Sequence, residues 1–375
     1  MRNNPNGMFF GMYRGKRVLV TGHTGFKGSW LVAWLLKLGA KVVGFSDTIP
    51  TNPAMFEVLE LAGRIEHHVG DVRDAAAVAK LIQDTQPDFV FHLAAQAIVS
   101  TSYKEPLNTI STNVMGTANV LEALRHLRHP CTAVIITSDK CYENFEWVWG
   151  YKETDHLGGR DIYSGSKGAA EVIFHSYYWA FFRDESKTPV RIATGRAGNV
   201  IGGGDWARDR IIVDCVRSWS QGGTVEIRSP EATRPWQHVL EPLSGYLTLG
   251  AELARNRDIC GESFNFGPRT ERNRTVLSLL GDLRKHWDLD PTGEAYRITD
   301  QVPFHEASLL RLNCDKAAFH LKWEASLSYV ECIEMVGRWY SNFYAGNLGK
   351  AYELTLSQIE QYEAAAAARG LAWTE

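Results

Sequence analysis

The sequence predicts an α/β protein in which a doubly wound, parallel-sheet Rossmann domain is joined to a smaller C-terminal α/β substrate lobe. Short β-branched runs alternate with helical patterns from Lys16 onward, which indicates crossover units and a parallel sheet. A glycine-rich turn follows the first of these runs. The length of 375 residues also suggests about two domains, at roughly 150 residues for each.

The predicted strands are short and nearly all apolar, as is usual for strands covered by helices on both faces. They are expected at residues 17–20, 41–45, 88–91, 133–136 and 190–193. Between the first two, apolar side chains recur at helical spacing from Phe26 to Leu38, and Gly39 ends the pattern. The first part of the chain is therefore expected to form a strand, a turn and a helix.

The regular alternation stops after about Ala193, where a Gly-rich segment and isolated aromatic residues follow. We expect the Rossmann domain to span residues 1–196, with a return of the chain at 237–267, and the lobe to span 197–236 and 268–375. Residues 263–267 predict a further strand of the first sheet. The alanine run at 364–368 predicts an exposed C-terminal helix.

The composition favours a small-molecule ligand over a nucleic acid or a membrane. Forty Lys and Arg residues against 43 Asp and Glu leave a formal net charge of −3, which gives no electrostatic reason to expect either partner. The longest apolar run, 30–36, falls short of the roughly 18 residues that span a bilayer, and residues 1–8 do not resemble a signal peptide. The six cysteines lack metal-site spacing, so we expect no metal and a cytoplasmic protein with reduced thiols.

The turn after the first strand has the spacing of a dinucleotide site. Gly22, Gly25 and Gly28 form a Gly-x-x-Gly-x-x-Gly pattern that opens the predicted helix, where backbone N–H groups and the helix dipole favour a pyrophosphate. Asp47 stands at the end of the second strand, where its carboxylate can accept from a ribose 2′-hydroxyl and repel a 2′-phosphate. NAD is therefore expected as the coenzyme, and Asp71 could reach its adenine amino group. The alternative is a tight connection with two surface acids.

A second pattern, Tyr163 and Lys167, suits acid–base chemistry because its four-residue spacing puts both side chains on one helix face. A phenol is a weak base near pKa 10, and a nearby ammonium group is expected to lower that pKa. An ordinary amphipathic helix is the alternative. The polar run 137–142 follows the strand at 133–136, at the edge of the sheet where open α/β folds bind ligands. A solvated turn is the alternative there, and Cys141 is expected to be a packing residue.

These motifs resemble the extended short-chain dehydrogenase/reductase family that acts on nucleotide-sugars, and within it the CDP-glucose 4,6-dehydratase group. The resemblance runs from about Gly15 to Lys316. It is carried by the segments 21–31, 92–96, 111–117, 137–142, 147–151, 196–206 and 234–242. The expected coenzyme contacts are Gly22, Thr24, Gly25, Phe26, Lys27, Gly28, Asp47, Asp71, Val72, Leu93, Ala94, Ala95, Tyr163 and Lys167.

The resemblance implies a redox-neutral reaction in three stages on one bound NAD. Tyr163, aided by Lys167 and Ser138, would deprotonate the sugar 4-hydroxyl as hydride leaves C4. The resulting ketone makes the C5 proton acidic, so that Lys140 can remove it while Asp139 protonates the departing C6 hydroxyl. Hydride return to C6 gives a 4-keto-6-deoxy sugar. The chemistry needs Lys140 neutral and Asp139 protonated, and burial favours both states.

The substrate is expected to be a CDP-sugar held mainly by Asn199, Arg208 and Arg234, since a guanidinium group matches phosphate oxygens. The weaker candidates for substrate binding are His238, Asn265 and Arg311. The chain departs from the group at 97–100, where Ala-Ile-Val-Ser replaces the common Pro-Leu-Val-Arg and leaves the sugar and nucleotide open.

Two other functions stay open from the sequence, as does the oligomeric state. The chain could be a 4-epimerase or decarboxylase of the same superfamily, or a regulatory NAD-binding module without turnover. We expect a homodimer or homotetramer, because closed symmetric assemblies are common and paired helices often form the contact in this superfamily.

Overall fold

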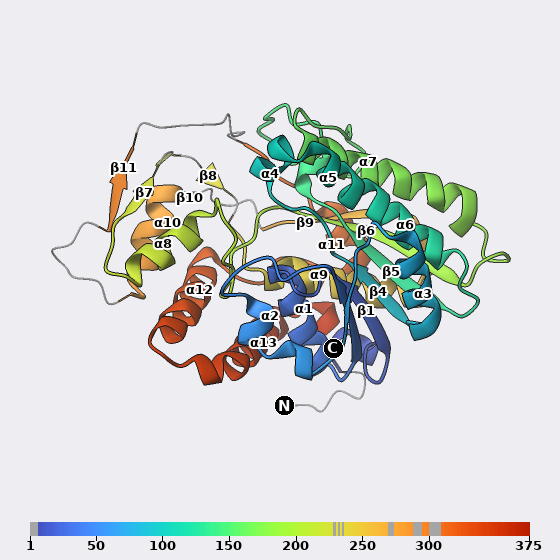
Figure 1. Ribbon diagram of the computed structural model, residues 1–375, viewed down its shortest axis with the longest axis horizontal. Helices are drawn as coiled ribbons and strands as arrows, with labels where there is room; N and C mark the ends of the chain where they lie inside the picture. The colour runs from blue at the N-terminus through green and yellow to red at the C-terminus, as the bar shows by residue number, and fades with distance from the viewer. Residues whose placement is uncertain are drawn as a thin grey trace.

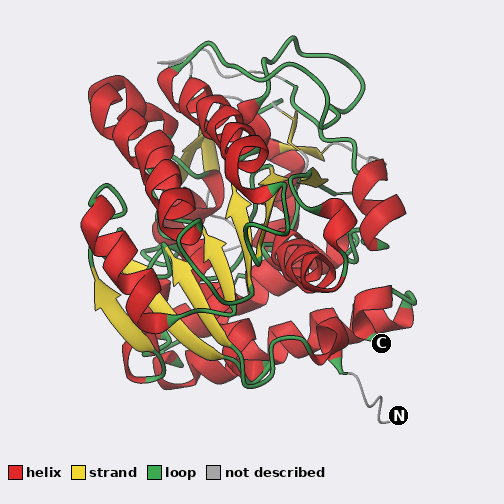
Figure 2. Cartoon of the chain, turned by 90° about the vertical axis from the view of Figure 1, so that its right-hand side faces the viewer, coloured by secondary structure: helices red, strands yellow, loops and turns green. Residues whose placement is uncertain are grey.

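The computed structural model describes residues 7–227, 230–231, 233–234, 236–268, 274–287, 295–299 and 309–375. Its centre is a seven-stranded sheet in the order β3-β2-β1-β4-β5-β6-β9, with every pairing parallel (Figures 1 and 2). The strands are β1 (Arg17–Thr21), β2 (Lys41–Ser46), β3 (Glu66–Val69), β4 (Phe89–His92), β5 (Cys131–Ile136), β6 (Val190–Ala197) and β9 (Ser263–Phe266). The predicted fold class is confirmed, and the run at 263–267 does return to the first sheet.

Helices cover both faces of this sheet, because successive side chains of each strand point to opposite sides. Leu19 of β1 faces one hydrophobic cluster, whereas Val18 and Val20 face the other. The first cluster packs under α3 (Ala75–Thr85), α6 (Gly116–Leu124) and α7 (Ile162–Tyr177). The second packs under α1 (Phe26–Lys37), α9 (Leu240–Arg255) and α13 (Ala351–Ala368). Figure 1 shows these two layers above and below the strands.

The second lobe lies beside the carboxyl ends of the strands, at the left of Figure 1. It contains two-stranded sheets, β7 with β11 and β8 with β10, packed with three helices. These elements are β7 (Val225–Ile227), β8 (Thr233–Arg234), β10 (Arg274–Thr275), β11 (Tyr296–Ile298), α8 (Ile211–Trp219), α10 (Val276–Arg284) and α12 (Tyr329–Tyr344). The shorter helices of the chain are α2 (Met55–Val58), α4 (Val99–Lys104), α5 (Pro106–Ile110) and α11 (Asp315–Leu321).

The C-terminal helix is less exposed than the sequence predicts. The alanine run ends α13, but Tyr362 and Ala366 are fully buried on its inner face. Trp34 of α1 donates to the Glu363 carboxylate at 2.8 Å across the same contact. The prediction of an exposed helix was wrong for this inner face, which packs against α1, whereas Ala364, Ala367 and Ala368 of the alanine run are exposed.

None of the described helices is both long and apolar enough to cross a membrane. The six cysteines are free thiols. Within the described ranges, no cluster of His, Cys, Asp and Glu side chains has the arrangement of a metal site.

Candidate active site

The turn between β1 and α1 can accept only glycine at two of its positions. Gly22 has a φ of 74°, and a Cβ there would stand 2.7 Å from the backbone nitrogen of Ala94. A Cβ at Gly28 would stand 2.2 Å from the carbonyl oxygen of Gly22. The helix begins at Phe26 with Gly25 as its N-cap, and no side chain caps it. The first backbone N–H groups of α1 are therefore arranged for an anionic ligand.

Thr24 and Lys27 of this turn have different surroundings. The Thr24 hydroxyl donates to the carbonyl oxygen of Thr48 at 2.6 Å, so Thr24 fixes the turn against the segment after β2. Lys27 is partly buried, and this burial, together with the neighbouring Arg210, lowers the pKa of Lys27 to about 8. The charges of Asp139 and Lys167 also act on Lys27. The coenzyme turn, residues 22–28, and the catalytic residues therefore lie close enough for their charges to interact, and we call the region where they meet the cleft.

Two carboxylates, Asp47 and Asp71, lie just after the ends of β2 and β3. Asp47 is exposed, as a contact to a ribose requires. Asp71 accepts a hydrogen bond from Arg73 Nε at 2.7 Å, and this bond lowers the pKa of Asp71. Asp71 is thus already paired with Arg73, a partner that was not expected when Asp71 was predicted to contact the adenine. That role stays a prediction.

The remaining predicted coenzyme contacts surround the same turn. Leu93 and Ala94 follow β4, and their N–H groups donate to the backbone and the hydroxyl of Thr21. Ala95 comes next in the chain, and Val72 packs against Gly116 of α6. The glycine cradle, the uncapped helix start and the exposed Asp47 together fit a dinucleotide.

A single 3₁₀ turn, Asp139–Cys141, follows β5, and we call it the catalytic turn. Ser138 is its N-cap, and Asp139 and Lys140 are its first two residues. Ser138 accepts from the Lys140 N–H at 3.2 Å and donates to Asp139 Oδ1 at 2.9 Å. Burial raises the pKa of Asp139, and the charge of Lys140 only partly opposes this. Asp139 is therefore held in the direction of a protonated acid, as its predicted role requires. Lys140 is partly buried beside it.

Tyr163 and Lys167 stand on the buried face of α7, whose start is capped by Asp161. Burial lowers the pKa of Lys167 to about 8. Burial also raises the pKa of Tyr163 to about 12, although the neighbouring Ser138 acts in the opposite direction. The expected lowering of the phenol pKa was wrong for the protein alone, because desolvation of the phenolate outweighs the favourable contacts.

A buried polar network beneath the catalytic turn was not foreseen from the sequence. Glu171, one helical turn after Lys167, pairs with Arg196 of β6 at 2.9 Å through both carboxylate oxygens. Thr137 also donates to Glu171, and Arg196 donates to the Tyr142 hydroxyl at 2.7 Å. Because Thr137 and Tyr142 bracket the catalytic turn, the network fixes that turn against α7.

A second unforeseen contact joins the segment after β4 to α7. Asn113 lies in a π-helical turn, Ser111–Met115, between α5 and α6. Its amide donates to Ser166 Oγ at 2.9 Å and accepts from the Gln96 N–H at 2.9 Å. Asn113 belonged to a recognised segment, but nothing in the sequence indicated its partners.

The predicted substrate residues fall into two groups. Asn199 and Arg208 are exposed near the end of β6 and before α8, where a ligand could reach them. Arg234 lies in β8, opposite Arg274, and its side chain is outside the described residues. Arg311 donates to the Val148 carbonyl at 3.4 Å. Asn199, Arg208 and Arg311 thus come from separate segments of the chain.

His238 and Asn265 are instead buried. The His238 Nδ1 atom accepts from the Leu240 N–H at 3.3 Å, and burial lowers its pKa to about 3, so the ring is neutral. The side-chain amide of Asn265 accepts a hydrogen bond from the Tyr142 hydroxyl and donates to the backbone carbonyls of Tyr151 and Asn313. Both roles in substrate binding stay predictions, and the contacts of Asn265 are those of a residue that supports the catalytic turn.

Arg210 is a cleft residue that the sequence reasoning missed. It pairs with Asp205 at 2.9 Å just before α8, and its charge acts on the pKa values of both Lys27 and Tyr163. The sequence does contain a signal for it, because Arg210 stands two positions from Arg208, which was predicted to bind the substrate.

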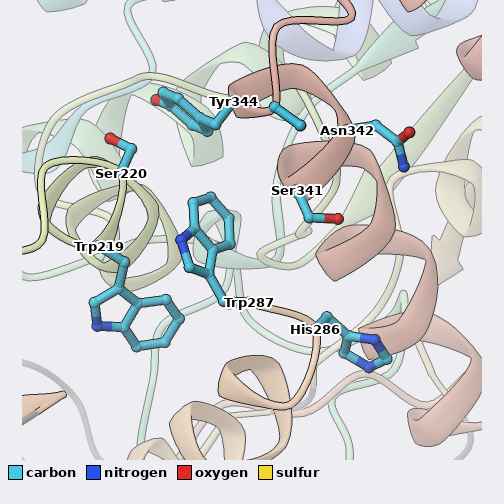
Figure 3. A pocket seen from close by; sticks show the side chains of 8 residues that line it. Trp219, Ser220, His286, Trp287, Ser341, Asn342 and Tyr344 are labelled. Atoms are coloured by element: carbon cyan, nitrogen blue, oxygen red, sulfur yellow. The ribbon is translucent and has the colours of Figure 1, made fainter. Parts of the chain in front are cut away.

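A cavity of about 530 Å³ in the second lobe lies outside this constellation (Figure 3). Trp219, Trp287 and Tyr344 line it, and none of its lining residues belongs to the coenzyme turn or the catalytic turn. Ser341 and Asn342 at its rim donate to the carbonyl of Arg338 in their own helix. This cavity is thus lined by none of the predicted coenzyme or catalytic residues.

Comparison with known proteins agrees with this geometry. The sequence model of the GDP-mannose 4,6-dehydratase family matches residues 19–336. The CDP-glucose 4,6-dehydratase of Salmonella typhimurium is 44% identical over 336 residues, which cover 89% of this chain and 93% of that protein. The CDP-paratose 2-epimerase of Salmonella typhi is 26% identical, covering 87% and 99%.

Solved structures share the fold. DesIV, the dTDP-glucose 4,6-dehydratase of Streptomyces venezuelae with NAD and TYD bound, has a TM-score of 0.73 at 22% identity, covering 88% of this chain and 99% of its own. The epimerase Mth375 of Methanothermobacter thermautotrophicus has a TM-score of 0.75 at 23% identity, covering 91% and 96%. On the family match and the 44% relative, the chain belongs to the GDP-mannose 4,6-dehydratase family.

Proposed function

We propose that the protein is an NAD-dependent nucleotide-sugar 4,6-dehydratase, a hydro-lyase that converts CDP-glucose to CDP-4-keto-6-deoxyglucose and water. The observation that carries the proposal is the placement of Asp139 and Lys140 beside Tyr163 at the sheet edge that faces the coenzyme turn. The assignment of CDP-glucose rests on the 44% identical relative. The free cysteines fit a cytoplasmic site of action.

NAD is the proposed coenzyme because the cleft offers it a glycine cradle, an uncapped helix start and the exposed carboxylate of Asp47. When bound, NAD supplies a hydride acceptor for the first stage and a hydride donor for the last. Asp47 favours it over NADP, since a carboxylate repels a 2′-phosphate.

Tyr163 takes the proton from the sugar 4-hydroxyl. Burial keeps the phenol protonated in the protein alone, so this step depends on the groups that lower the pKa of Tyr163, which are the nearby Ser138 and the charge of Arg210. Lys167 lies one turn along the same buried face, and its pKa of about 8 lets it exchange a proton near neutral pH. The chain thus provides both a base and a route for that proton.

Lys140 and Asp139 carry out the elimination. Lys140 removes the C5 proton once C4 is a ketone, and Asp139 protonates the hydroxyl that leaves C6. The raised pKa of Asp139 keeps its proton available for this step. Ser138 orients the acid through its bond to Oδ1. Adjacent positions on one 3₁₀ turn place acid and base beside neighbouring carbons of the sugar.

Arg210 is the best placed cation for the substrate diphosphate, since its charge acts on both Lys27 of the coenzyme turn and Tyr163 of α7. Asn199, Arg208 and Arg234 remain further candidates for the nucleotide. A guanidinium group can donate two parallel hydrogen bonds to phosphate oxygens, which fixes a diphosphate in one orientation.

The reaction is tested by incubating the protein with NAD and CDP-glucose in deuterated water. The expected product is a 4-keto-6-deoxy sugar that carries solvent deuterium at C5, detected by NMR and mass spectrometry. A 4-epimer or a decarboxylated sugar would assign one of the alternatives within the superfamily. Retention of every tested nucleotide-glucose unchanged, with NAD still bound, would instead support a regulatory module.

The assembly we propose is a homodimer formed through α5 and α7. The outer face of α7 is a stripe of small and apolar residues at helical spacing, Ile162, Gly165, Ala169 and Val172, and the exposed Trp179 follows in the π-helical turn Tyr178–Phe182. Leu107 of the neighbouring α5 is 79% exposed beside it. A two-fold axis would bring this face onto its own copy, which makes the second copy the fitting partner.

The assembly is tested by sedimentation of Val172→Asp. Burying a charge at a helix contact is costly, so the variant should sediment as a monomer. Phe319→Asp is the matched control, because Phe319 is 71% exposed on α11, away from α7. A wild-type monomer, or a Val172→Asp variant that still sediments as a dimer, contradicts the proposal, and a wild-type tetramer would require a second contact.

A further inference from the structure

The hydroxyl of Tyr246 is buried without a partner. Tyr246 lies on α9 with 0% of its side chain exposed, and its hydroxyl makes no hydrogen bond among the described residues. An unpaired buried hydroxyl costs free energy that a phenylalanine would not, and such groups are rare in folded proteins. No described protein group therefore pairs with this hydroxyl, which leaves it available to a water molecule or a ligand.

The ring of Tyr246 stands directly below the catalytic turn. It packs against Gly195 of β6, where a Cβ would stand 2.9 Å from the ring atom Cδ1. Gly195 is paired in register with Ile136, the last residue of β5, so this is the end of the strand from which the catalytic turn starts. Three residues later, Gly198 lies against Asp139, with 3.0 Å between the Cβ position and Oδ2. Tyr246 and Asp139 thus both contact the carboxyl end of β6 or the residue just after it.

The electrostatics agree with this placement. Burial, followed by the negative charges of Asp139 and Tyr163, raises the pKa of Tyr246 far above its usual range. The phenol therefore keeps its proton and can act only as a hydrogen-bond donor to a nearby anion. The other charged groups that face Asp139 are Lys140 and Lys27.

We propose that Tyr246 is a positioning residue for Asp139, whose carboxylate its hydroxyl stabilises through one bridging water after the acid has given up its proton. The inference rests on the proposed function. In the elimination, the C6–O bond breaks, its electron pair stays with the departing oxygen, and the Asp139 proton completes a water molecule. Asp139 is left as a buried anion. Tyr246 then donates a hydrogen bond toward it without losing its own proton, which lowers the free energy of that state.

The test is Tyr246→Phe, which keeps the ring on Gly195 and removes only the hydroxyl. Difference infrared spectroscopy against pH follows the protonated carboxyl band of Asp139, assigned by its loss in Asp139→Asn. Loss of a donor to the carboxylate should raise the titration midpoint of Asp139 by about one pH unit and slow dehydration about tenfold. Thermal stability should fall less than in the control below, because no described protein group loses a hydrogen-bond partner.

Tyr362→Phe is the matched control, since Tyr362 is also fully buried but its hydroxyl donates to Glu241 at 2.7 Å. It should lose thermal stability with no change in the Asp139 midpoint. An unchanged midpoint in Tyr246→Phe would overturn the inference, whether or not stability falls. A shifted midpoint in a protein that fails to convert CDP-glucose would keep the link and reject the proposed function.

Discussion

The two sides of the cleft hold their polar groups in different ways. On the sheet side, each catalytic residue lies at the end of a buried strand or on α7, and fixed partners such as Glu171 and Asn113 hold the surrounding backbone. On the lobe side, Asn199 and Arg208 are exposed. The bond-making groups are therefore preorganised before any ligand arrives, whereas the groups expected to choose the substrate can change without disturbing the fold.

The largest effect should come from Lys140→Met on the sheet side. Removing a general base typically costs 10²–10⁴-fold in rate, and here it should block C5 proton removal while hydride transfer from C4 continues. Enzyme-bound NADH should accumulate when CDP-glucose is added, which absorbance at 340 nm records. Dehydration at the wild-type rate would show that Lys140 is not the base.

Glu171→Gln should produce the next largest effect, through the fixed partners of the sheet side. Burial alone would raise the pKa of Glu171, but the charge and hydrogen bonds of Arg196 lower it to about 2 from 4.5. Because the folded pKa is depressed, this contribution of about 3 kcal/mol is present above pH 4.5 and is lost as the pH falls toward 2. The variant should lose stability at pH 7 and show a flatter acid limb in urea unfolding. An unaltered acid limb would contradict the buried ion pair.

The third prediction compares Gly28→Ala, in the coenzyme turn on the sheet side, with Gly281→Ala, on α10 of the lobe side. The added methyl at Gly28 would meet the carbonyl of Gly22, so the turn must shift and NAD affinity should fall at least tenfold by calorimetry. Gly281 on α10 has open space around its Cβ position, so alanine there should stabilise the protein by up to about 1 kcal/mol. Equal NAD affinity in both variants would argue against the glycine turn as the coenzyme cradle.

The smallest effects should come from the lobe side, where Arg210→Ala and Arg208→Ala can be compared. Arg210 is paired with Asp205, and its charge acts on Tyr163, so its loss should raise KM for CDP-glucose about tenfold. The exposed Arg208 should change KM less than threefold. The reverse order would move the diphosphate toward Arg208 and the outer rim of the lobe.

The sequence predicts the sheet and the cleft well because those signals are local. Strand runs, the glycine turn and the four-residue spacing of Tyr163 and Lys167 can each be found within a few positions. The partners of Glu171 and Asn113 could not be found this way, since Arg196 is 25 residues from Glu171 and Ser166 is 53 residues from Asn113. The direction of the Tyr163 pKa was missed because burial depends on the whole fold.

Some of the misses were avoidable. Arg73 stands two positions from Asp71 and could have been weighed as its partner. The placement of the second lobe was harder, because its short strands pair across long stretches of chain, as Thr233 does with Thr275. Turns with regular elements on both sides are predictable, whereas contacts between distant segments need the folded chain.

Helix α7 carries chemistry on one face and a bare apolar stripe on the other. Tyr163 and Lys167 are rigidly coupled through the helix backbone to Val172 and its neighbours, which never approach a reacting atom. A substitution on the outer face can therefore change how the molecule associates without removing any group that takes part in the reaction.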